Sequence, residues 1–133
     1  MNVVQKLLAI DAGKIKTPTK DVKMKLQKLG GEEFIFPCKA IDPEYVAELQ
    51  ENAIEFKKSE LSKIKVYDTK VLTIVEGCQE VFKSSELMKH FNGHTPKELV
   101  KKLLLSGEMD DLKAEIDKLG GYDKEKDEEE VKN

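Results

Sequence analysis

The clearest pattern in the chain is a strict alternation of apolar and polar residues, which is typical of half-buried β-strands. After Asp21 it brings three side chains to one face, namely Val22, Met24 and Leu26. Residues 33–40 repeat the alternation with Phe34, Phe36 and Cys38. Gly30 and Gly31 stand between the two segments and are a hairpin signal. The pattern therefore predicts a β-hairpin, and Pro37, which has no N–H to donate, places its second strand at a sheet edge.

Two shorter segments complete the N-terminal half. In residues 62–67, Ile64 and Val66 alternate with lysines, which we interpret as a short third strand for the sheet. Near the N-terminus, Val3, Val4, Leu7 and Leu8 follow a helical spacing that Gly13 ends. This spacing predicts an amphipathic helix, which an extended connector around Pro18 joins to the hairpin.

Helical spacing dominates the remaining chain. Asp42 followed by Pro43 is a strong helix start, with an apolar stripe that runs from Tyr45 to Phe56. Further helices are predicted over residues 69–77, 84–91, 96–105 and 108–119. Thr95, Pro96 and Glu98 form a capping-box sequence before the third of these, and glycines end the last one.

These elements predict an α+β fold in a single domain, residues 1–122. It consists of an N-terminal helix (1–13), a strand–helix–strand region (20–67) with a small antiparallel sheet, and a predominantly α-helical C-terminal half (68–120). Residues 123–133 are acidic and contain one aliphatic side chain, Val131. Such a segment cannot offset the entropy of ordering its backbone, so we expect a disordered tail.

The charge composition disfavours nucleic acid and membrane partners. All 23 basic residues are lysines, whereas arginine is the side chain that best reads phosphate and guanine. The formal net charge of −3 resides in the acidic tail, which leaves the body of the chain neutral. No apolar run approaches the ~18–20 residues that span a bilayer, and we expect no secretory signal, because Gln5 and Lys6 interrupt the apolar residues near the start. The two cysteines are too few for a disulfide framework and fit a reducing cytosol.

The residue types that carry chemistry do not form a recognisable site. Cys38, Cys78, His90 and His94 are the candidate metal ligands, but the cysteines are isolated, and Asn92 with Gly93 breaks the helix between the histidines. The chain contains no nucleophile elbow and no phosphate-binding glycine loop. We therefore expect no catalytic, cofactor-binding or metal site, and no enzyme activity.

One alternative function comes from the outline of residues 84–105, a helix, a glycine-containing turn and a second helix. This is the outline of a helix-turn-helix, and a small DNA-binding regulator would use the second helix for recognition. That helix presents Lys97, Glu98, Lys101 and Lys102, none of which is the arginine, asparagine or glutamine that reads bases.

The order of several motifs resembles the phage tail assembly chaperones of PBSX-like (XkdN-like) prophages, contractile phages and tail-like bacteriocins. The motifs are residues 74–78 (IVEGC), 82–87 (FKSSEL), 95–99 (TPKEL), 103–108 (LLLSGE) and 121–123 (GYD). Their structural residues include Thr95, Pro96, Glu98, Gly107 and Glu108. The sequence departs from the family pattern by lacking a proline near Val81 and by having Met109 in place of an aromatic residue.

The resemblance implies a non-catalytic assembly factor without a cofactor, in the cytoplasm of the bacterial host and absent from the mature particle. Its implied partners are the tape measure protein and the tail tube protein. The expected binding surface is the last helix pair, because three consecutive leucines cannot all face one core. The residues of this surface are Leu99, Leu103, Leu104, Leu105, Met109, Leu112 and Ile116. Self-association through the same surface is equally allowed.

Overall fold

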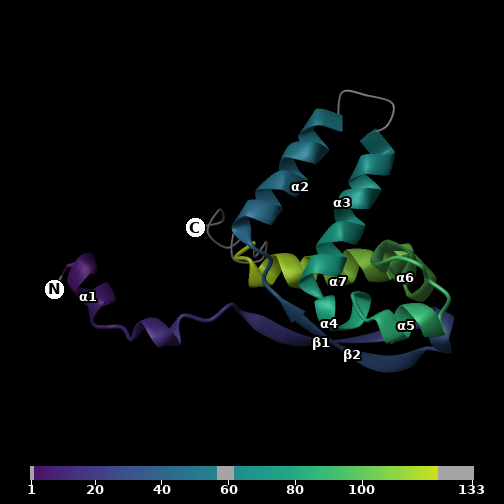
Figure 1. Cartoon of the computed structure of the whole chain (residues 1–133), viewed down its shortest axis with the longest axis horizontal. Coiled ribbons are helices and arrows are strands. Elements are labelled where there is room, and N and C mark those ends of the chain that lie inside the picture. The colour runs from purple at the N-terminus through teal and green to yellow at the C-terminus, as the bar shows by residue number, and fades with distance from the viewer. Residues whose placement is uncertain (1, 57–61, 123–133) are drawn as a thin grey trace, which may run out of the picture.

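A computed structural model describes residues 2–56 and 62–122 of the chain (Figure 1). The described part contains a two-stranded antiparallel sheet and mostly α-helical structure beyond it, so the α+β class is confirmed. The elements are α1 (Val3–Leu8), β1 (Thr19–Leu26), β2 (Glu32–Lys39), α2 (Pro43–Phe56), α3 (Ser62–Gly77), α4 (Gln79–Phe82), α5 (Ser85–His90), α6 (Pro96–Leu103) and α7 (Ser106–Leu119). Two short 3₁₀ turns, Ala12–Lys14 and Gln27–Leu29, lie on either side of β1.

The hairpin forms as the alternation predicts. Val22 pairs with Phe36 across the two strands, and both side chains are buried, whereas Ile35 on the other face is exposed. Gly30 and Gly31 both have positive φ angles, of 76° and 77°, a conformation that glycine adopts without steric cost. The two glycines therefore allow the chain to reverse after the 3₁₀ turn.

The predicted third strand is wrong, because residues 62–67 form the first part of α3. This helix begins well before position 69 and packs against α2, so that the two helices lie side by side as a helical hairpin (Figure 1). A segment this short fits both the two-residue period of a strand and the 3.6-residue period of a helix. Here it continues the helical period of the apolar residues that follow it in α3. The hairpin is covered by α4 and α7 instead of by a third strand.

The N-terminal helix is shorter than predicted and stands away from the body (Figure 1). The Asn2 side chain accepts a hydrogen bond from the Gln5 backbone N–H, and the Gln5 side-chain oxygen accepts one from the Asn2 backbone N–H. The helix ends at Leu8, because Asp11 then caps a separate 3₁₀ turn by accepting from the Gly13 N–H at 2.9 Å. None of the residues of α1 is buried.

The core lies between the inner face of the hairpin and the helices α3, α4, α6 and α7 (Figure 1). The rings of Phe36 on β2 and Phe82 on α4 stack with centroids 6.0 Å apart. The largest fully buried side chains are Phe82, Leu26, Ile74, Leu99, Leu104, Leu112 and Ile116. The apolar stripes of the C-terminal helices are therefore used to build this core.

The break between α6 and α7 comes earlier in the chain than the sequence pattern predicts. The helix predicted to run to position 105 ends at Leu103, and α7 begins at Ser106 instead of at position 108. Leu104 lies between them with extended backbone. This break turns Leu103 and Leu104 into the core together and leaves Leu105 42% exposed.

Candidate partner-binding surfaces

The structure places six of the seven predicted partner-binding residues in the core. These six are Leu99, Leu103, Leu104, Met109, Leu112 and Ile116, each at most 5% exposed. They pack α6 and α7 against α3, so a partner cannot reach them while these helices remain in place. Leu105 alone of the seven has a large exposed side chain.

The motif residues at the start of α6 satisfy backbone groups that the helix leaves without partners. Thr95 is the N-cap, and its Oγ1 accepts a hydrogen bond from the Glu98 N–H at 3.2 Å. The Glu98 carboxylate accepts from the His94 N–H at 2.6 Å instead of from Thr95 itself. In the predicted capping box, Glu98 would accept from the N–H of the N-cap residue Thr95. It accepts instead from the N–H one residue earlier in the chain.

Glu108 joins the corner between α6 and α7 to the end of β1. Its Oε1 accepts a hydrogen bond from the Leu105 N–H at 2.7 Å, and its Oε2 accepts from the Gln27 N–H at 3.1 Å. Lys28 donates to the Lys101 carbonyl at 2.8 Å and adds a second link to the same corner. These contacts hold the hairpin turn against the corner between α6 and α7.

An open groove lies at the other end of α7, between the start of α2 and the end of β2. It consists of two adjoining hollows of about 730 and 310 Å³, which share Ile41, Pro43 and Gly120. The smaller hollow is mainly apolar, with Ile41, Pro43, Val46, Ile116 and Tyr122 in its lining. We call the two hollows together the α2–α7 groove. Ile116 is the one predicted partner-binding residue in its lining.

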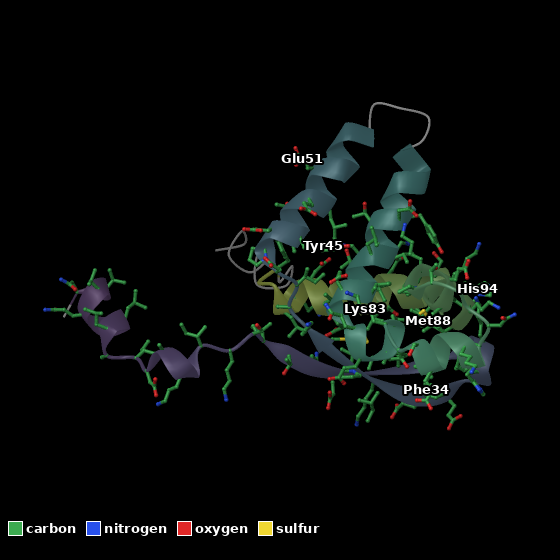
Figure 2. All side chains as sticks on the ribbon, viewed as in Figure 1. Phe34, Tyr45, Glu51, Lys83, Met88 and His94 are labelled. Atoms are coloured by element: carbon green, nitrogen blue, oxygen red, sulfur yellow. The ribbon has the colours of Figure 1, made fainter. Side chains whose placement is uncertain are left out.

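Sequence reasoning missed this groove because its two sides are far apart in the chain. Residues 41–50 supply one side and residues 116–122 the other. Tyr45 lies at the foot of α2, where it lines the larger hollow (Figure 2). No local pattern marks positions that lie opposite each other only because α2 and α7 both pack against α3.

The groove has an acidic border. Its lining contains Asp42, Glu76 and Asp117 against one lysine, Lys39, and Asp117 is paired with Lys113 at 2.6 Å. Burial, followed by the nearby carboxylates of Glu76 and Glu48, raises the pKa of Tyr45, so its hydroxyl stays neutral. Along α2, the acidic residues are Glu44, Glu48, Glu51 and Glu55, and this helix has no basic residue.

The structure brings the two cysteines together but keeps the two histidines, the other candidate metal ligands, away from them. Cys38 and Cys78 are buried in the core, whereas His90 and His94 are exposed, with His94 at the side of the body away from α2 (Figure 2). A hydrogen bond between the two thiols, together with burial, raises the pKa of Cys78, so this thiol stays protonated. In residues 2–56 and 62–122, no group of three or more histidine, cysteine or acidic side chains could hold a metal ion.

The segment with the helix-turn-helix outline forms α5 and α6. The apolar side of α6 is buried, and Lys97 at its start lies 3.8 Å from the Asp68 carboxylate. Lys101 and Lys102 are exposed together with Glu98, so an acidic side chain interrupts this basic surface.

The comparison with protein families decides between a DNA-binding regulator and a tail assembly chaperone. The model of the phage XkdN-like tail assembly chaperone proteins matches residues 4–132 of the chain. The chain belongs to this family. No curated protein matches it. Among solved structures, the crystal structure of the protein yqbn is similar, with a TM-score of 0.53 and 23% sequence identity over 85% of this chain and 93% of that chain.

The family match confirms the resemblance and the general role as a phage tail assembly chaperone. The likeness to yqbn supports the α+β fold. Within the part of this chaperone that the structure describes, every helix is too short or too polar to cross a bilayer. The α2–α7 groove and Leu105 are thus two apolar features of the body that a protein partner of this chaperone could contact.

Proposed function

We propose that this tail assembly chaperone binds the tape measure protein and helps to recruit tail tube subunits during tail morphogenesis, without catalysing a reaction. The observation that carries the proposal is the family match, which extends over nearly the whole chain. A chaperone of this kind acts before the tail is complete. The proposal therefore includes action in the cytoplasm of the bacterial host and absence from the mature particle.

The α2–α7 groove is the surface that we propose for the tape measure protein. Amphipathic helices bind partners by placing an apolar stripe into an open hydrophobic groove. The smaller hollow offers such a lining, and Tyr122 at its edge is 53% exposed and therefore accessible. Leu105 lies at the opposite end of α7 and is proposed as a second contact.

Co-expression with the tape measure protein of the same phage tests the function. We expect the chaperone to raise the soluble yield of the tape measure protein, because it covers apolar helices that otherwise aggregate. The fraction of tape measure protein in the supernatant is measured with and without the chaperone. An unchanged fraction would overturn the proposed function.

Three matched substitutions test the surface in the same assay. Tyr122→Glu introduces a charge at the groove, and Leu105→Glu does so at the second contact. Ile35→Glu is the control, because Ile35 is 57% exposed on the outer face of the hairpin. We expect the first two variants to lower the soluble yield and the control to retain it. If Tyr122→Glu behaves like the control, the groove is not the binding site.

A further inference from the structure

The N-terminal arm, residues 2–16, contains six of the ten large apolar side chains that are exposed in the described part of the chain. Its helix α1 projects from the body at the end of an extended connector (Figure 1). Leu7 is 62% exposed and Leu8 is 79% exposed. The exposed apolar side chains of the arm are Val3, Val4, Leu7, Leu8, Ile10 and Ile15.

The arm needs a partner to hold this conformation. A helix of six residues is shorter than the roughly 12–15 residues that an isolated helix needs to be even marginally stable in water. In α1, Leu7 lies one turn after Val3, and Leu8 lies one turn after Val4. The four side chains therefore form one apolar stripe. Burial of this stripe in a groove would stabilise the helix and remove apolar surface from water.

We propose that the arm of one copy of this chain docks into the α2–α7 groove of a second copy. The groove is the apolar hollow at the foot of α2, and its smaller part is lined by Ile41, Val46 and Tyr122. The stripe of α1 occupies this hollow, and the polar residues of the arm lie along the outside of α2.

Charge complementarity supports this occupant. The arm contains Lys6, Lys14 and Lys16 against a single acidic residue, Asp11. The lining of the groove contains Asp42, Glu76 and Asp117 against one lysine, Lys39, and α2 adds Glu44 and Glu48 near its start. The arm is therefore basic where the border of the groove is acidic, and their opposite charges favour this orientation.

The position of the root of the arm favours a second copy over the groove of the same chain. Thr17 and Pro18 line the larger hollow, so the arm leaves the body from the edge of its own groove. Pro18 holds the residue before it in an extended conformation, and α1 stands away from the body and from this edge (Figure 1). Two copies that face each other groove to groove would exchange arms reciprocally, which closes a two-fold symmetric dimer.

The proposal rests on the proposed function only in that the arm and the tape measure protein use the same groove. The experiments below contain no tape measure protein. The arm contact can therefore fail while the co-expression assay succeeds, and the two outcomes are distinguishable.

Cross-linking between differently sized copies tests the contact directly. One copy carries Ala9→Cys at the end of α1, and a second copy, lengthened by a fusion tag, carries Gln50→Cys at the groove. Both native cysteines are at most 2% exposed, so a bismaleimide reacts with the introduced thiols in the folded protein. We expect a product with the mass of one long and one short chain.

In a control pair of copies, the tagged copy carries Lys89→Cys instead of Gln50→Cys. Lys89 is exposed, and its helix α5 lies across the body from the start of α2 (Figure 1). We expect this pair to give little product. Equal products from both pairs would overturn the proposal. A single chain with both Ala9→Cys and Gln50→Cys that closes only on itself would also overturn it, because the arm would then occupy its own groove.

Substitutions in the arm separate docking from folding. Leu8→Glu places a charge on a side chain that is already exposed, so the body folds as before. For the unmodified protein, we expect light scattering to give twice the mass of one chain. For Leu8→Glu, we expect the dissociation constant of the dimer to be at least about tenfold higher. Lys14→Glu with Lys16→Glu is expected to weaken the dimer, and Glu44→Lys with Glu48→Lys in the same chain is expected to restore it. A monomeric unmodified protein, or variants without effect, would contradict the proposal.

Discussion

Gly77 is a position at which α3 and α7 approach each other closely. A Cβ atom at this position would lie 2.5–2.8 Å from three side-chain atoms of Ile116. Carbon atoms do not approach so closely without strain, so the absence of a side chain allows the two helices to pack at this distance. The sequence pattern indicated only that a helix ends near Gly77.

The substitution Gly77→Ala should lower the free energy of unfolding by about 1–3 kcal/mol, the usual cost of overpacking a core. Ile116→Ala removes all three of the contacted atoms, so the double variant should lose less stability than the sum of the two single variants. Urea denaturation of the four proteins measures this coupling. Gly107→Ala is the control, because a Cβ there meets no atom within 4 Å. Additive losses would contradict the close contact.

At the scale of elements, α7 is attached to β1 by an ion pair as well as by the core. Lys20 Nζ lies 2.7 Å from Glu115 Oε2, with side chains 54% and 25% exposed. This hydrogen bond, followed by the charges of Lys20 and Lys118, holds the pKa of Glu115 below its ordinary value of 4.5. A carboxyl group with a lowered pKa stabilises the folded state as long as it is ionised.

The contribution of this pair should be fully present above about pH 4.5 and should be lost as the pH falls through the lower, folded-state pKa of Glu115. Lys20→Met should therefore cost at most about 1 kcal/mol at pH 7, since the pair is partly exposed, and less at pH 3. Urea denaturation at both pH values measures the difference. Lys25→Met on the same strand is the control, and equal losses at both pH values for Lys20→Met would contradict the assignment.

Most elements could be predicted because their signals are local. The alternation from Val22 to Leu26 and the Asp42 and Thr95 helix starts each act within a few residues. Residues 62–67 were misassigned because a run of six residues satisfies both the strand and the helix period. Packing of α3 against α2 and α7 decides that ambiguity in favour of the helix.

At the scale of the whole molecule, the predicted disordered tail lies outside the described residues, and its disorder stays a prediction. The three lysines and six acidic residues of positions 123–133 leave it with little apolar surface to bury. Ending the chain at Tyr122 should therefore change the free energy of unfolding by less than about 0.5 kcal/mol. Thermal and urea denaturation of both chains measure the change, and a larger loss would show that the tail packs against the body.

The sequence by itself determined the hairpin, most of the helix starts, the α+β class and the family, because each follows from short-range periodicity, capping or the order of motifs. Tertiary structure decided which apolar residues remain accessible. The packing of α6 and α7 against α3 turned most of the predicted binding surface into core, and the placement of α2 and α7 on the same helix α3 created a groove from distant segments. Burial depends on where whole elements meet, and a local pattern records only which face of an element is apolar.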